Sequence, residues 1–99
     1  MNTESAKNRR IRIALLNLLK TEYPGAIDIK ALRFAMDNLG YPMPEGALDA
    51  HLRYLEEKDY VSIEKRKGFG FHIAFASLTA RGWDLLDGYL MERGIDEKV

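Results

Sequence analysis

The sequence predicts an α+β protein that is mainly helical, and three observations lead to this class. Four segments of helical length carry apolar residues at the spacing of a 3.6-residue repeat. Between the third and the fourth lie two short alternating runs separated by Gly68 and Gly70, which is the pattern of a hairpin. Ala26-Ile27 adds a strand stub. The predicted order is therefore helix, stub, helix, helix, strand, strand, helix.

The first predicted helix covers about residues 6–22, with Ser5 as its candidate N-cap. Its apolar residues recur at i, i+3, i+4, i+7 and i+8 and form one stripe, and Ile13 and Leu16 lie off the centre of that stripe. Two explanations stay open for these two side chains: a wide core face, or a surface that contacts another subunit. The helix ends before Pro24, because proline disfavours helical backbone in the residue before it.

The second and third predicted helices are separated by a stiff, proline-rich connector. Asp28 is a candidate N-cap for a helix over about residues 29–39, and Gly40 follows where left-handed backbone is favoured. The third helix covers about residues 44–58, because Pro44 suits a first helical turn. Three leucines line its inner face at 100° per residue. The residues predicted to point outward are Gly46, Asp49, Ala50, Arg53 and Glu57, with Tyr54 at the flank and His51 bordering the core.

The hairpin is predicted over about residues 60–66 and 71–78, with three consecutive cations, residues 65–67, just before its turn. Each face of the second strand carries apolar residues, so the alternation does not decide whether a bulge changes the register.

The last predicted helix covers about residues 80–91 and begins at the candidate N-cap Thr79. Gly82 lies inside this helix, where glycine costs about 1 kcal/mol relative to alanine, so a close approach of another helix is expected there. Trp83 lies at the edge of its apolar face. Residues 94–99 are predicted to be a loose tail.

The length and composition predict one domain over residues 1–99, with a core at about 8–92 and polar tails at both ends. The sequence has no cysteine and two histidines, which excludes thiolate metal sites and leaves no expected metal or cofactor. No apolar run approaches the roughly 20 residues of a membrane helix. The first residues are polar and form no signal region, so the cytoplasm is the expected compartment.

The charges balance, with 15 basic and 15 acidic residues, which argues against a nucleic-acid binder with a broadly basic footprint. They are distributed in blocks, however. Residues 1–33 and 61–78 carry an excess of basic residues, whereas residues 34–60 and 79–99 carry an excess of acidic residues. A positive face is therefore compatible with a neutral chain.

Three short strings carry a resemblance to a known family. They are Leu52-x-x-Leu55, Tyr60-Val61 and Leu78-Thr79-Ala80-Arg81-Gly82. With the order of elements, they make nearly the whole chain resemble a winged helix-turn-helix domain: a three-helix core, a two-stranded wing with a short strand stub, and a C-terminal helix. The last string is similar to strings in many bacterial winged-helix regulators. Together with Leu39-Gly40-Tyr41, the arrangement also resembles small winged-helix proteins of transposable, Mu-like phages and prophages.

This resemblance implies a DNA-binding protein, a transcriptional regulator of bacterial or prophage origin. Helix 44–58 would enter the major groove and wing 60–78 would contact the backbone. Arg53 suits guanine, whereas the acidic residues of the same face repel phosphates, although a carboxylate can accept a hydrogen bond from cytosine. The alternative is a solvated helix face. The candidate DNA-binding residues are Glu45, Gly46, Asp49, Ala50, Arg53, Tyr54, Lys65, Arg66, Lys67 and Phe69.

Alternatives also stay open for the other candidates. The wing cations would neutralise phosphates or only keep the hairpin soluble. Phe69 would insert into a minor groove, contact a protein or fold back onto the core. The basic residues near the N-terminus would contact phosphates or form the solvated side of the first helix. These N-terminal residues are Lys7, Arg9, Arg10 and Arg12.

A homodimer is expected, because a two-fold dimer reads two half-sites of double-stranded DNA. The candidate dimer surface consists of Ile13, Leu16, Trp83, Tyr89 and Met91.

The rival hypothesis is a winged-helix adaptor that binds a protein and no DNA, which the zero net charge, the acidic residues of the third helix and Phe69 favour. Enzymatic activity is not expected, because neither His51 nor His72 has a recognisable catalytic neighbour and no phosphate-binding loop is present.

Overall fold

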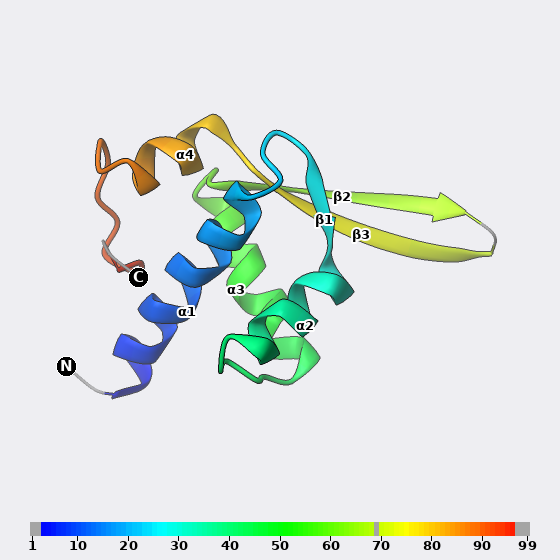
Figure 1. The fold of residues 1–99 in the computed structure, drawn as a ribbon, viewed down its shortest axis with the longest axis horizontal. Coiled ribbons are helices and arrows are strands. Elements are labelled where there is room, and N and C mark those ends of the chain that lie inside the picture. The colour runs from blue at the N-terminus through cyan, green and yellow to red at the C-terminus, as the bar shows by residue number, and fades with distance from the viewer. Residues whose placement is uncertain (1–2, 69, 97–99) are drawn as a thin grey trace.

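In the computed structural model, residues 3–68 and 70–96 are described, and they form four helices and a three-stranded antiparallel sheet (Figure 1). The predicted class, α+β and mainly helical with a winged-helix arrangement, is confirmed. The elements are α1 (Thr3–Lys20), β1 (Ala26–Asp28), α2 (Ile29–Asn38), α3 (Glu45–Glu57), β2 (Val61–Gly68), β3 (Phe71–Leu78) and α4 (Ala80–Leu86).

The sheet has the strand order β1-β3-β2, and both pairings are antiparallel. The register of β2 with β3 runs without a break from Val61 opposite Leu78 to Gly68 opposite Phe71, so this hairpin contains no bulge. Strand β1 covers only the end of β3 nearest the helices. The rest of the hairpin therefore projects from the helical body as a wing (Figure 1).

Helix α1 lies against α2, α3, α4 and β3 and buries side chains on more than one side. Ile13 is 2% exposed and Leu16 is 0% exposed, so both belong to the hydrophobic core. Their placement on a dimer surface is therefore wrong, and the wide core face is the correct alternative. Elements of the same chain cover both side chains, because α2, α3, α4 and β3 surround α1.

Two of the three N-cap residues that the sequence predicted cap their helices. The Asp28 carboxylate accepts a hydrogen bond from the backbone N–H of Lys30 at 2.7 Å and caps α2. The Thr79 hydroxyl accepts from the N–H of Gly82 at 3.0 Å and caps α4. Ser5 lies inside α1, which begins earlier, so its assignment as an N-cap is wrong.

The C-terminal part of the chain differs most from expectation. Helix α4 ends at Leu86 instead of about Met91, and Gly88 takes a positive φ of 86° where the chain reverses. Ile95 is buried in the core, and the backbone N–H of Asp96 donates to the carbonyl of Arg9 at 3.2 Å. The predicted loose tail is therefore wrong for residues 94–96, and residues 97–99 lie outside the described residues.

Arg12 connects this C-terminal segment to α1 and α3. Its guanidinium donates to the carbonyl of Gly94 at 3.1 Å and to Nδ1 of the buried His51 at 3.2 Å. It also lies 3.9 Å from the centroid of the Tyr54 ring. Burial and the neighbouring Arg12 charge both lower the pKa of His51. Burial likewise lowers the pKa of Arg12.

Gly82 marks a close approach, but its neighbour is not another helix as expected. A Cβ atom at this position would meet the carbonyl oxygen of Tyr60 and the side chain of Leu78. The start of α4 therefore packs against the residue that leads into β2 and against the end of β3.

Gly82→Ala should lower the free energy of unfolding by about 1–3 kcal/mol, because the backbone oxygen of Tyr60 must shift to admit a methyl group. Gly46→Ala is the matched control, since nothing lies within 4 Å of its added Cβ. It should leave stability unchanged or raise it by up to about 1 kcal/mol. Urea denaturation of the two variants measures both values, and equal stabilities would contradict the close approach.

Acidification below about pH 6.5, the usual pKa of histidine, should destabilise the protein through His51. The lowered pKa in the folded state means that the unfolded chain takes up a proton that the folded chain does not. The stabilisation is complete above that pH and is lost as the pH falls toward the folded pKa.

Urea denaturation at about pH 7.5 and 5.5 tests this for His51→Gln, which keeps an acceptor for Arg12 and removes the titrating group. The variant should lose less stability on acidification than the wild type. His72→Gln removes an exposed imidazole and is the matched control. An identical loss in His51→Gln and wild type would contradict the expectation.

Candidate nucleic-acid interface

The outward face of α3 is exposed as its periodicity predicts. Gly46, Asp49, Ala50 and Arg53 are exposed, because the three leucines on the opposite side are buried in the core. The side chain of Glu45 lies outside the described side chains. This exposed face is free to meet a partner, and its contact with DNA stays a prediction.

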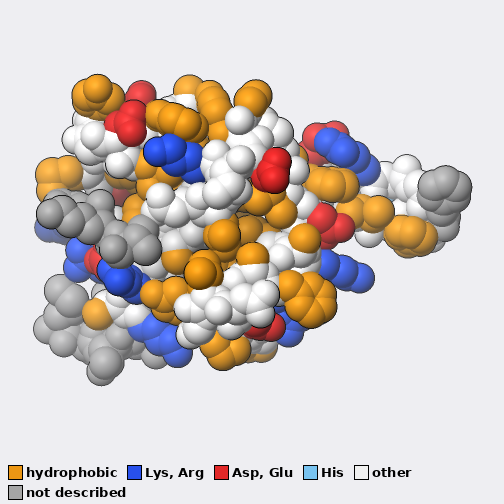
Figure 2. Space-filling view, viewed as in Figure 1, with side chains coloured by type: hydrophobic (Ala, Val, Ile, Leu, Met, Phe, Trp, Pro, Cys, Tyr) orange, Lys and Arg blue, Asp and Glu red, His pale blue; other side chains and the backbone are white. Residues whose placement is uncertain are grey.

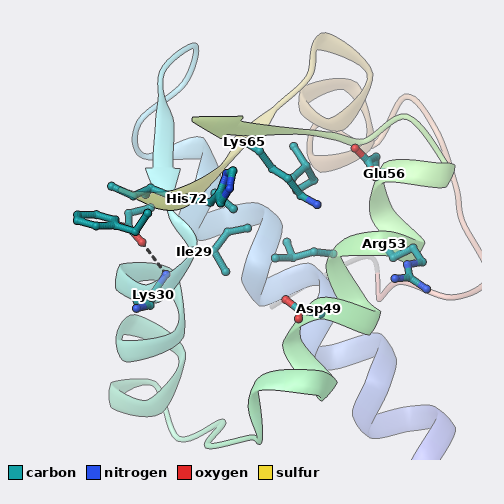
Figure 3. A pocket seen from close by; sticks show the side chains of 13 residues that line it. Ile29, Lys30, Asp49, Arg53, Glu56, Lys65 and His72 are labelled. Carbon is teal, nitrogen blue, oxygen red and sulfur yellow. Dashed lines mark hydrogen bonds between the residues drawn. The ribbon is translucent and has the colours of Figure 1, made fainter. Parts of the chain in front are cut away.

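A cleft of about 550 Å³ lies between this helix, the start of α2 and the wing (Figure 3). Apolar and charged side chains both line it. Three separate segments of the chain build it, so it could not be predicted from local sequence patterns. The lining residues are Asp28, Ile29, Lys30, Asp49, Leu52, Arg53, Glu56, Ile63, Lys65, Phe71, His72, Ile73 and Ala74.

The charges around the cleft are arranged by element. Lys30 and Lys65 come from α2 and the wing, whereas Asp49 and Glu56 come from α3. In Figure 3 the Lys65 side chain extends from the wing toward α3, and the Asp49 carboxylate points from α3 into the cleft. The side formed by α2 and the wing therefore carries two lysines and the carboxylate of Asp28, whereas the side formed by α3 carries two carboxylates and Arg53.

The two faces of the wing differ in charge. Side chains alternate along a strand, so Lys65 and Lys67 share the face of the buried Val61, and Arg66 lies on the opposite face. Lys65 stands opposite Ala74, and Lys67 stands opposite His72. Of the three consecutive cations, Lys65 and Lys67 therefore lie on the face toward the cleft, and Arg66 lies on the outer face.

Arg66 is held on the outer face by local contacts. Its Nε lies 3.0 Å from Oε1 of Glu64, and its guanidinium lies 4.2 Å from the centroid of the Phe75 ring. The hydrogen bond and the charge of Arg66 lower the pKa of Glu64, and Glu64 raises the pKa of Arg66 in return. This ion pair balances the cation on the outer face, whereas Lys65 and Lys67 form no ion pair with the described residues. Phe69 lies outside the described residues.

Tyr54 does not join the exposed face. It is half-buried beneath Arg12, and the backbone at Gly94 lies against its hydroxyl. Helix α1 and the C-terminal segment lie on the side of α3 that carries it, and its contact with DNA stays a prediction.

The N-terminal cations are also largely committed within the chain. Arg9 forms an ion pair with Asp96 at 3.2 Å, and Arg12 binds His51 and Gly94. A role in phosphate contacts therefore finds no support for these two side chains.

Figure 2 shows acidic and basic side chains together where the wing leaves the body.

The remaining candidates for a dimer surface lie near α4. Trp83 is half-buried. The centroid of its ring lies 4.9 Å from the centroid of the Tyr23 ring and 4.5 Å from Nζ of Lys20. Tyr89 and Met91 are each 78% exposed. These two are thus the candidates with free surface, and their contact with a second copy stays a prediction.

Within the part of the chain that the structure describes, no group of three or more metal-binding side chains could hold an ion. Across residues 3–68 and 70–96, no helix is both long and apolar enough to cross a lipid bilayer.

Comparison with known proteins adds one solved structure. No protein-family model matches the chain, and no curated protein matches it. The chain is similar in structure to a protein from Thermoplasma acidophilum that is described as a "putative transcriptional regulator". The TM-score is 0.64 at 19% sequence identity, and the match covers 80% of this chain and 76% of that chain. At this identity the similarity establishes a shared fold.

Proposed function

We propose that the protein binds double-stranded DNA as a transcriptional regulator, with α3 in the major groove and the wing on the phosphate backbone. The observation that carries the proposal is the shared cleft: the exposed face of α3 and the lysine face of the wing border it together. A helix and a hairpin that face the same side can contact a groove and its adjacent backbone at once. The description of the structural neighbour supports this direction.

The distribution of cations supports the same docking. Lys30, Lys65 and Lys67 have side chains with no ion pair among the described residues. They come from the two elements that flank α3, where the strands of a duplex would run beside an inserted helix. Cations at these positions neutralise phosphates and fix the orientation of the protein. A neutral chain can thus hold DNA with a small set of free cations on one side.

The finer parts of the proposal are a homodimer that reads two half-sites, a bacterial or prophage origin and a cytoplasmic location. Trp83, Tyr89 and Met91 near the end of α4 are the candidate contacts between two copies. The origin rests on the resemblance of the sequence, the location rests on the proposed regulatory role, and the dimer rests on the number of base pairs that one module can contact.

A winged-helix module that binds a protein is the second candidate function. Asp49 and Glu56 place carboxylates in the cleft, where they repel phosphates. Phe34 of α2 is 71% exposed, and Phe71 of the wing is 54% exposed, which offers apolar surface to a protein partner. This function entails no duplex binding at low salt and co-purification with a protein.

Fluorescence anisotropy with a labelled random duplex at about 50 and 200 mM salt separates the two functions. Under the DNA proposal, binding should be micromolar or tighter at the lower salt and should weaken steeply as salt rises, because bound phosphates release counterions. An unchanged anisotropy at about 50 mM salt would exclude non-specific DNA binding and favour the protein-binding function.

Lys65→Gln should weaken duplex binding more than Arg66→Gln, although both remove one positive charge. Lys65 faces the cleft, whereas Arg66 is paired with Glu64 on the outer face. The slope of log K against log salt should decrease by about 0.9 for the lysine variant, the value for one lost phosphate contact. It should change by clearly less for the arginine variant. Equal changes in the two variants would contradict the proposed orientation of the wing.

A further inference from the structure

Asp49 and Arg53 of α3 are both exposed, and both line the cleft. Their side chains form no hydrogen bond or ion pair with any residue that the structure describes. They are four residues apart in a helix, where an acidic and a basic side chain often pair. Glu64 and Arg66 of the wing, by contrast, are engaged with each other. The two groups on α3 are therefore both available to a ligand.

Helix geometry places the two side chains on one face. Four residues advance about 6 Å along the axis and about 40° around it. Successive bases on a strand are about 3.4 Å apart, so the two side chains can reach bases one or two steps from each other. Gly46 and Ala50, which are exposed beside them, are small and permit a close approach of the helix to the groove floor.

The chemistry of the two groups is complementary to one kind of base pair. In the major groove, cytosine presents a 4-amino donor and guanine presents the acceptors O6 and N7. An ionised carboxylate only accepts, and a guanidinium only donates. Asp49 therefore matches cytosine and is repelled by the O4 of thymine and the O6 of guanine. Arg53 matches guanine.

We propose that Asp49 and Arg53 form a recognition pair, in which Asp49 accepts a hydrogen bond from the 4-amino group of a cytosine and Arg53 donates to O6 and N7 of a guanine within two base steps. This inference rests on the proposed insertion of α3 into the major groove. It gives the acidic residue on the exposed face a function: Asp49 lowers the affinity for most sequences and is compensated only where a cytosine amino group meets it.

The first test is selection of binding sites from a randomised duplex pool. The wild type should enrich a cytosine and a guanine at positions no more than two steps apart. Asp49→Ala should lose the cytosine preference, and Asp49→Asn should replace cytosine with adenine, because an amide pairs with N6 and N7 of adenine. Asp84→Asn on α4 makes the same change of charge away from the cleft and should keep the wild-type site. Arg53→Gln should lose the guanine.

The second test removes a single functional group from the DNA. Replacing the selected cytosine with pyrimidin-2-one removes its 4-amino group. Wild type and Asp84→Asn should then bind about tenfold more weakly, the ratio that one lost base contact of about 1.4 kcal/mol produces. Asp49→Ala should bind the two duplexes equally, because it has no acceptor to lose. The difference between these ratios isolates the Asp49 contact from any general effect of the analogue.

Two results would overturn the recognition pair while leaving the DNA proposal intact: salt-dependent duplex binding without an enriched cytosine, or a cytosine preference that Asp49→Ala retains. An absence of salt-dependent binding by the wild type would overturn both proposals together. Circular dichroism of each variant, compared with the wild type, separates lost recognition from lost folding.

Discussion

The burial of α1 is the constraint on which the rest of the structure depends. Leu15, Leu16 and Leu19 are all fully buried, and the helix lies against α2, α3, α4 and β3. Removing one such leucine side chain costs about 2–5 kcal/mol, a large part of the about 5–15 kcal/mol that stabilises a typical domain. Helix α3 and the base of the wing are both fixed by packing around this one helix. The outward face of α3 and the cleft follow from that packing.

A second set of contacts, polar rather than apolar, fixes the far end of α3. Tyr60, just before β2, donates to Glu92 at 3.0 Å, and Lys58 lies 3.7 Å from the same carboxylate. Burial and the bond to Glu92 raise the pKa of Tyr60, so the phenol keeps its proton and remains a donor. The Arg12 guanidinium also donates to the carbonyl of Gly94. Through these contacts the C-terminal segment connects α1 to the end of α3. The orientation of the exposed α3 face therefore depends on residues that make no contact with the cleft.

The sequence predicted what local chemistry determines and missed what depends on distant partners. Caps at Asp28 and Thr79 and the periodicity of α3 are local signals, and the structure confirms them. The burial of Ile13 is not local, because a helical wheel shows a second apolar side without showing what covers it. Ile95 was missed for the same reason: one apolar residue in a polar tail has no periodicity.

The candidate site follows the same division between local and distant determinants. The exposed residues of α3 were predictable from 100° per residue, and the two faces of the wing were implicit in strand alternation. The ion pair of Arg66 with Glu64 could not be predicted in this way, because strand alternation places both residues on the outer face but does not show that their side chains meet. The cleft needed the tertiary arrangement of α2, α3 and the wing. Contact of any of these residues with DNA stays a prediction.

The arrangement of charges separates affinity from choice of sequence in the proposed complex. The free lysines stand on the wing and at the start of α2, where phosphates would pass, so they supply attraction that is the same for every sequence. The face of α3 carries carboxylates beside Arg53 and contributes little net attraction. Binding at that face must then come from hydrogen bonds to base edges, which only some sequences provide. A net charge of zero is therefore compatible with a DNA-binding protein whose general affinity is low and whose selectivity is carried by one helix.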